Sequence, residues 1–333
     1  MSKKILVYGA GAIGCVVAAR LTLAGHQVTV LARGEKVETL KQKGIHLKDV
    51  LGEFQVHPSR IVDTEACIEK QDFIFIATKF NALYEISTQL KRYMHNATVI
   101  VPLMNGIPFW YFYGLENNSE HSSINCLDQQ GVLNVHFPLE HLIGAVVFIT
   151  AQSVNENEVK SDNPYLLIFG EPSHQMTERL DALVELFENT SIEARPVENI
   201  RDQIWTKVMA NLSSNPLSVV ADAPLSKIYA DQNLIRITQQ ILYEVRAVAA
   251  CYSARINIDP NTFLKLGSEM GETYTSMWHD YKNHRPLELA PIAEAVFELA
   301  DAYECPMPTS KLIYELTVYL SEQARTRNNE DEK

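Results

Sequence analysis

The stretch Ile5-Leu6-Val7-Tyr8-Gly9-Ala10-Gly11-Ala12-Ile13-Gly14 decides the fold of the first half of the chain. A short run with strand character leads into G-x-G-x-x-G, which opens a segment of helical periodicity. In such a loop Gly9 permits a tight turn, Gly11 lets a diphosphate approach the backbone, and Gly14 allows close packing of helix on strand. The first N–H groups of the helix then face the phosphates. The pattern indicates a dinucleotide-binding loop, with a purely structural glycine turn as the alternative.

Strand-like and helix-like patterns alternate through the first half of the chain. Runs rich in β-branched residues occur at residues 5–8, 27–32, 72–77, 98–102 and 144–150. Helical patterns occur at residues 13–24, 83–94 and 177–189. Residues 152–172 look like an antiparallel addition. Because strands that alternate with helices form βαβ units, we expect a mostly parallel sheet.

The second half of the chain has almost no strand-like runs. Segments of 3.6-residue periodicity occur at residues 201–214, 232–253, 260–281, 290–303 and 309–326, which is typical of an all-helical domain. We therefore predict an α/β protein with an N-terminal Rossmann-type dinucleotide-binding domain, an all-helical C-terminal domain and a frayed tail, at residues 1–196, 197–326 and 327–333.

Arg33 stands where the second strand is expected to end. An NAD-binding fold usually has Asp or Glu at this point, which accepts a hydrogen bond from the ribose 2′-hydroxyl. The sequence is instead Leu31-Ala32-Arg33-Gly34, and an arginine can pair with a 2′-phosphate. We therefore expect NADP(H). The alternative is that Arg33 is a solvated loop residue and that Glu35 takes the acidic role.

Two later strand ends also carry polar residues. Thr78-Lys79 follows the third clear strand, and Asn105-Gly106 follows the fourth. Because ligands of open α/β sheets bind outside the carboxyl ends of the strands, we expect Lys79 and Asn105 near the nicotinamide end of a dinucleotide. The alternatives are a solvated charge at Lys79 and a simple turn at Asn105-Gly106.

Lys207, Asn211 and Asn215 form a polar stripe on one predicted helix, because they are spaced four residues apart. No charged residue occurs from Val208 to Ala221, which indicates a helix buried around its circumference. Burial lowers the pKa of a lysine toward a value useful for proton transfer. The alternative is that Lys207 reaches water and the asparagines cap helix ends.

A second polar pair, Ser276 and Asp280, has i, i+4 spacing, and Glu288 follows one turn before a helix that is expected to begin at Pro291. On spacing alone, Ser276 is a surface residue and Glu288 a charge at a helix start.

Taken in order, these motifs resemble those of the ketopantoate reductase (2-dehydropantoate 2-reductase) family. The matching features are GAGAIG, the arginine of LARG, TK at 78–79, NG at 105–106, WxKxxxNxxxNP at 205–216, SMxxD at 276–280, and Glu288. The resemblance extends from residue 5 to about residue 320. It implies NADPH-dependent reduction of 2-dehydropantoate to pantoate, a step of pantothenate and coenzyme A biosynthesis.

The resemblance also implies a role for each matching residue. Lys207 corresponds to the catalytic lysine, which polarises and protonates the C2 carbonyl oxygen as hydride reaches the carbon, and Glu288 orients it. The substrate-binding residues are then Asn211, Asn215, Ser276, Lys79 and Asn105. The cofactor-binding residues are Gly9, Ala10, Gly11, Ala12, Ile13, Gly14, Arg33, Lys79, Asn105 and Glu288.

Residues 107–114 depart from the family pattern, with five aromatic residues among seven. Such a loop can line a pocket wall, seal a lid, contact a partner or pack locally. The exact 2-oxo acid that serves as substrate is therefore left open. Two other functions are therefore kept: reduction of a bulkier 2-oxo acid, and an NADPH-binding sensor without catalysis. A sensor needs only the loop of the first domain, so the presence of Lys207, Asn211 and Glu288 together argues against a sensor.

The formal charge of the 333-residue chain is −12, from 29 basic and 41 acidic residues. This balance argues against nucleic acid and anionic membranes as partners. A small 2-oxo acid and NADP(H) are themselves anions, so we expect their charge to be met locally by the helix start at residues 11–14, Arg33, Lys79 and Lys207. A homodimer is left open.

The five cysteines are scattered, without a CxxC or a Cys/His cluster. This pattern indicates reduced thiols in a cytoplasmic protein and predicts no metal site.

Overall fold

A computed structural model describes residues 2–115 and 123–331 of the chain. The contacts divide the chain into two compact units. Unit 1 comprises Met1–Met104, Trp110–Ser122 and Gly131–Ile200. Unit 2 comprises Asn105–Phe109, Ser123–Gln130 and Arg201–Lys333.

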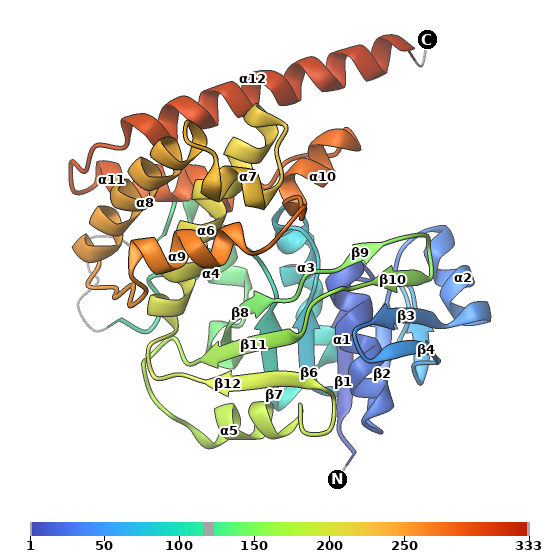
Figure 1. The fold of residues 1–333 in the computed structure, drawn as a ribbon. Helices are drawn as coiled ribbons and strands as arrows, with labels where there is room; N and C mark the ends of the chain where they lie inside the picture. Colours follow the sequence, from blue (N-terminus) through green and yellow to red (C-terminus); the bar gives the residue numbers. More distant parts are fainter. Residues whose placement is uncertain (1, 116–122, 332–333) are drawn as a thin grey trace. The chain divides into compact units, whose positions relative to one another are not determined.

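A five-stranded parallel sheet is the centre of unit 1 (Figure 1). Its strands lie in the order β5-β2-β1-β6-β7, with bounds Arg60–Val62, Gln27–Leu31, Lys4–Tyr8, Gln71–Ile76 and Met94–Pro102. From β1 the chain forms β2 and β5 on one side of the sheet, and it later forms β6 and β7 on the other side of β1. The carboxyl ends of β1 and β6 therefore flank the switch point at which open α/β sheets bind their ligands.

Two smaller sheets complete the strands of unit 1. One has the order β4-β3-β10-β9, with bounds Gly52–Val56, Ile45–Asp49, Glu158–Lys160 and Gln152–Ser153. The other has the order β12-β11-β8, with bounds Ile192–Pro196, Tyr165–Gly170 and Gly144–Phe148. The expected antiparallel addition at 152–172 is thus divided between two sheets, and β10 and β11 each pair with one parallel and one antiparallel neighbour.

The α-helices of unit 1 are α1 to α5, with bounds Ala12–Leu23, Glu35–Lys43, Leu83–Gln89, Val132–His136 and Glu178–Glu185. Short 3-10 turns occupy Phe80–Ala82, Leu90–Tyr93, Gln129–Gly131 and Leu139–His141. The predicted helix at 83–94 is wrong in its last part, because Leu90 and Tyr93 are buried at 3-10 spacing and Met94 already belongs to β7. All residues of α1 from 14 to 21 are buried, and all of them except Arg20 are apolar or glycine.

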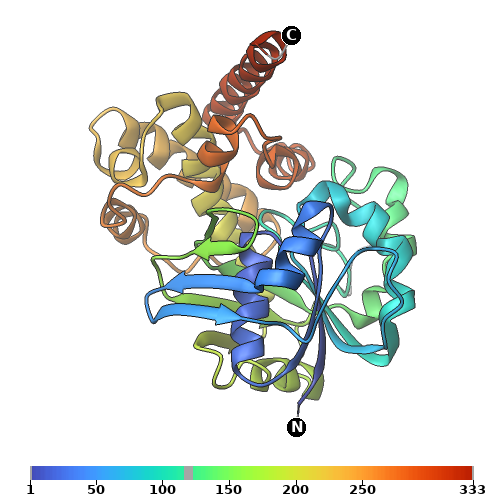
Figure 2. The same ribbon diagram turned by 90° about the vertical axis from the view of Figure 1, so that its right-hand side faces the viewer.

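The first small sheet packs against α1, and Figure 2 shows its blue strands in front of that helix. Buried Arg20 of α1 forms an ion pair with Asp49 of β3, and the hydroxyl of Tyr165 in β11 donates to the same carboxylate at 2.8 Å. These contacts link α1, and with it the glycine loop, to β3 and β11.

Unit 2 is helical, as predicted. Its elements are α6 to α10, the π-helical turn η5, α11 and α12, with bounds Ile200–Ala221, Leu225–Ala230, Leu234–Cys251, Pro260–Ser268, Ser276–Lys282, Ala290–Glu294, Ala295–Asp301 and Pro308–Asp331. The periodic segment at 260–281 forms two helices: Gly271 has φ +66°, and the Thr275 side chain caps a new helix. Helix α12 continues to Asp331, past the point at which a frayed tail was expected, and its sequence contains no Gly or Pro after Pro308. Among the residues that the structure describes, no helix has the length and apolar character needed to cross a membrane.

Candidate active site

The glycine loop of unit 1 lies between β1 and α1, and two of its glycines have no room for a side chain. The N–H of Gly9 donates to the Leu31 carbonyl at 3.0 Å, and the N–H of Ala77 donates to the Tyr8 carbonyl at 2.8 Å. A Cβ on Gly9, where φ is +110°, would lie 2.7 Å from Thr78 Cγ2. A Cβ on Gly14 would lie 2.0 Å from the Gly9 carbonyl oxygen. Both positions therefore require glycine.

The N-terminus of α1 is open to an anion. Gly11 is its N-cap residue and has no side chain with which to cap the first turn, and that turn contains no acidic residue. Its first N–H groups and the positive end of its dipole therefore remain available for negative charge.

Thr78 adds an independent indication of a ligand at this loop. It follows β6 beside Gly9, and its hydroxyl is buried without a hydrogen-bond partner in the part of the chain that the structure describes. An unsatisfied buried hydroxyl costs about 1–3 kcal/mol, and a ligand oxygen would remove that cost. The donor set thus fits the diphosphate of a dinucleotide. Thr78 was not among the predicted site residues, although its position just after β6 could have identified it.

The two predicted basic residues of unit 1 belong to the same edge of the sheet. Lys79 follows Thr78 and is partly buried. Arg33 follows β2, and its Nη2 lies 2.9 Å from Glu85 Oε1, with the two side chains 51% and 52% exposed. Burial raises the pKa of the Tyr8 hydroxyl, and a hydrogen bond from Arg33 opposes this shift. An exposed ion pair contributes about 0–1 kcal/mol, so Arg33 can exchange Glu85 for a phosphate at little cost.

Helix α6 of unit 2 carries the predicted polar stripe. Lys207 and Asn211 are partly exposed, Asn215 is only 5% exposed, and every residue from 212 to 219 is buried. Ser214 Oγ donates to Asn215 Oδ1 at 3.2 Å, which helps to fix that amide. The stripe therefore extends from a partly open end at Lys207 into the interior of unit 2.

The ammonium of Lys207 has a strongly perturbed acidity. Burial lowers its pKa to about 8, and the carboxylate of Glu288 acts in the opposite direction. The structure thus brings together, within unit 2, the two residues predicted to be catalytic. A lysine that titrates near neutral pH can hold a proton and also release it, as a general acid must.

The loop that carries Asn105 is bonded to the segment that follows Glu288. The Ile107 N–H donates to the Pro291 carbonyl at 2.7 Å. Gly106 has φ +86°, and a Cβ there would lie 2.2 Å from the same oxygen. Pro291 belongs to the π-helical turn η5, and such turns are frequent at functional sites. Asn105 is therefore positioned in unit 2 together with Glu288.

Ser276 is the first residue of α10 and is exposed, and Asp280 lies one turn later. The preceding residue, Thr275, connects this helix start to α6, since its Oγ1 lies 2.6 Å from Ser218 Oγ. Ser276 is thus placed in the same unit as the polar stripe, through its neighbour rather than by a contact of its own.

The aromatic run after Asn105-Gly106 packs locally. Phe109, Trp110, Tyr111 and Phe112 are only 1–7% exposed, and Tyr113 is 39% exposed. The Trp110 ring occupies the space above Gly144, where a Cβ would lie 2.6 Å from it. Of the roles left open for this loop, the structure therefore favours packing over a lid or a partner contact.

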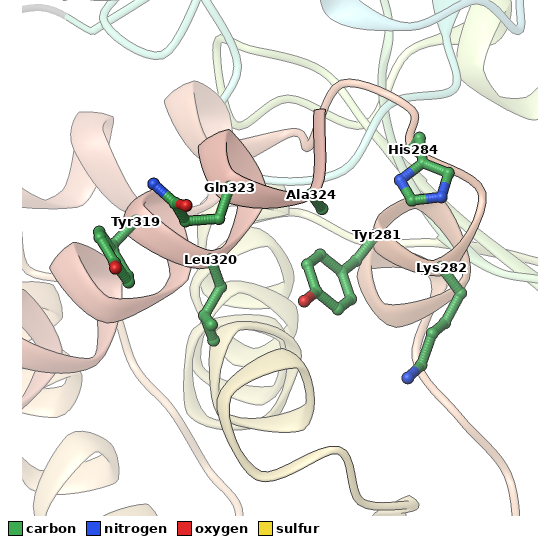
Figure 3. Close-up of a pocket in the computed structure, with 7 residues that line it drawn as sticks. All are labelled: Tyr281, Lys282, His284, Tyr319, Leu320, Gln323 and Ala324. Carbon is green, nitrogen blue, oxygen red and sulfur yellow. The ribbon is translucent and has the colours of Figure 1, made fainter. Parts of the chain in front are cut away.

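A hollow of about 370 Å³ lies between α10 and α12 (Figure 3). Its lining residues are Tyr281, Lys282, His284, Tyr319, Leu320, Gln323 and Ala324. Figure 3 shows the Tyr281 ring pointing toward Leu320, whereas the Lys282 side chain points away, and its Nζ lies 3.0 Å from Asp222. None of the predicted site residues lines this hollow, so it is not our candidate active site.

A parallel-sheet unit with a dinucleotide-type glycine loop and a helical unit with a lysine of lowered pKa are the features expected of a dinucleotide-dependent oxidoreductase. Comparison with known proteins identifies the family. Residues 5–174 match the family model described as ketopantoate reductase PanE/ApbA, and residues 199–319 match that of its C-terminal part. The chain belongs to the ketopantoate reductase family of oxidoreductases.

Individual relatives agree with this assignment. A 2-dehydropantoate 2-reductase of Mesorhizobium japonicum is 30% identical over 307 residues, which cover 92% of this chain and 94% of the relative. A 2-dehydropantoate 2-reductase structure from Geobacter metallireducens GS-15 has a TM-score of 0.81 at 25% identity, over 96% and 99% of the two chains. A D-mandelate dehydrogenase in complex with NADH and anilino(oxo)acetate has a TM-score of 0.81 at 20% identity, over 96% and 99%, which shows a shared fold alone.

Proposed function

We propose that this protein catalyses the NADPH-dependent reduction of 2-dehydropantoate to pantoate, in pantothenate and coenzyme A biosynthesis. The observation that carries the proposal is Lys207, whose pKa burial lowers to about 8 near Glu288, in a chain that matches the reductase family in both parts.

The residues of unit 1 fit the cofactor. The glycine loop from Gly9 to Gly14 and the Thr78 hydroxyl would hold the diphosphate, and Arg33 would pair with the 2′-phosphate. Lys79 would bind near the nicotinamide end. When bound, the dinucleotide supplies the hydride that reduces the C2 carbonyl carbon.

Lys207 provides the proton in this proposal. As the carbonyl carbon is reduced, negative charge develops on its oxygen, and an ammonium is most stabilising at that moment. Lys207 polarises the oxygen and then protonates it. Glu288 keeps the ammonium oriented, and its charge offsets part of the effect of burial on the pKa.

Three side chains of unit 2 would bind the rest of the substrate. The Asn211 and Asn215 amides suit the substrate hydroxyl, and the exposed Ser276 hydroxyl at the start of α10 suits the carboxylate. Asn215 is only 5% exposed, and a site that pairs a substrate hydroxyl with an amide discriminates strongly against an analogue that lacks the hydroxyl.

The substrate proposal is tested by the absorbance of NADPH during turnover with a panel of 2-oxo acids. We expect the highest kcat/KM with ketopantoate, at least about 100-fold above 2-oxoisovalerate, which lacks the hydroxymethyl group. If only a bulkier acid such as benzoylformate is reduced, ketopantoate is not the substrate and the protein is a reductase of bulkier 2-oxo acids. A protein that binds NADPH but reduces none of these acids would be a sensor.

A further inference from the structure

Two cysteines that are distant in sequence lie together in unit 2. Cys251 is the last residue of α8, Cys305 lies in the turn between α11 and α12, and their Sγ atoms are 3.3 Å apart. Both residues are partly exposed, so a small oxidant can reach them. Figure 1 shows α8 beside α11, in agreement with the contacts between the two helices.

The backbone holds both residues in place. The Cys305 N–H donates to the Ala300 carbonyl at 2.9 Å, and the next residue is Pro306. Cys251 belongs to the last turn of an 18-residue helix. A disulfide has an S–S distance of about 2.05 Å, so the two sulfur atoms need to approach by only about 1 Å.

Two of the other thiols, Cys15 and Cys126, differ from this pair. Burial raises the pKa of Cys15 to about 11 and that of Cys126 to about 12, which suppresses their reactive thiolate forms. The pKa of Cys305 is also raised, but chiefly by the hydrogen bond with Cys251. The hydrogen bond that raises the pKa of Cys305 therefore also directs one sulfur atom of the pair toward the other.

We propose that Cys251 and Cys305 are a modification site that forms a reversible disulfide with a hydroperoxide as oxidant. With hydrogen peroxide, one thiolate attacks the O–O bond, and the products are a sulfenic acid and water. The second sulfur then attacks the sulfenic sulfur, the S–S bond forms, and a second water leaves. The two thiols lose two electrons and two protons, one peroxide becomes two waters, and a dithiol reverses the change.

The disulfide would strengthen packing near the proposed catalytic helix. Tyr252 follows Cys251, its ring stacks on Trp205 of α6 at 6.3 Å, and its hydroxyl donates to the Leu299 carbonyl of α11 at 3.0 Å. A covalent link at Cys251 and Cys305 therefore fixes the contact between α8 and α11 beside this cluster. We expect thermal stability to rise on oxidation.

The test uses the full chain, reduced and then treated with a small excess of hydrogen peroxide, followed by alkylation of free thiols and peptide mass mapping. We expect a cross-linked peptide that contains Cys251 and Cys305, lost on treatment with dithiothreitol, and a midpoint of thermal unfolding about 5–10 °C higher. Cys251→Ser and Cys305→Ser should each abolish both effects. The matched control Cys67→Ser, at an exposed cysteine, should retain them.

The proposal is overturned if peroxide oxidises Cys67 while Cys251 and Cys305 both remain open to alkylation. It is equally overturned if Cys305 is converted to a sulfinic acid without any cross-link. Neither result depends on substrate or turnover, so the fate of this proposal is separate from that of the reductase activity.

Discussion

Replacing Lys207 by methionine is expected to lower kcat for ketopantoate reduction by about 10³-fold, measured as NADPH oxidation under saturating conditions. Methionine keeps the length and packing of the side chain but has no proton to donate and no charge to stabilise the developing oxyanion. Because burial opposes the ammonium at this position, its removal should not lower the midpoint of thermal unfolding. If Lys207 were merely structural, its replacement would leave kcat nearly unchanged and would lower the midpoint of thermal unfolding.

The matched control for this variant is Lys227→Met, at an exposed lysine of α7 in the same unit. It should leave kcat unchanged, and NADPH should bind equally well to both variants. If Lys207→Met retains nearly full kcat, Lys207 does not supply the proton and the proposed mechanism is wrong.

Replacing Arg33 by aspartate is expected to weaken NADPH binding by about 100-fold, with little change for NADH, measured by titration of each cofactor. A charge-assisted hydrogen bond contributes about 1.5–3 kcal/mol, and the new carboxylate repels the 2′-phosphate. The same carboxylate can accept from the 2′-hydroxyl of NADH. The preference for NADPH over NADH should therefore fall by about 100-fold.

Glu85→Gln is the control for that experiment, because it removes the partner of Arg33 and keeps the arginine. The pair is half exposed, so NADPH should bind equally well or up to about fivefold more tightly. Equal losses of NADPH and NADH affinity in Arg33→Asp would show that Arg33 does not read the 2′-phosphate.

Local sequence patterns predicted much of the fold. The run before Gly9 and the glycine spacing are local signals, and the structure confirms a strand, a tight turn and a helix there. The break within residues 260–281 was not located from the sequence, because a left-handed Gly271 and the Thr275 cap interrupt a periodic pattern that looks continuous.

What the sequence could not reveal depends on the tertiary fold. The effect of the Glu288 charge on the pKa of Lys207 acts between residues that are far apart in sequence. The same holds for the approach of Cys251 to Cys305. Thr78 has an ordinary loop environment in the sequence, and only the fold shows that its hydroxyl is buried without a partner in the described part of the chain. The aromatic run 107–114 was compatible with a pocket wall, a lid or a partner contact, because the sequence does not show that most of these side chains are buried.

The pH dependence of a single turnover tests the central claim most directly, since it reports the proton donor during ketopantoate reduction by NADPH. The donating form is the ammonium of Lys207, whose pKa is about 8. The rate constant should therefore be maximal below pH 8 and fall by about tenfold per pH unit above it. A rate constant that stays constant or rises from about pH 6 to pH 10 would contradict the role of Lys207 as general acid.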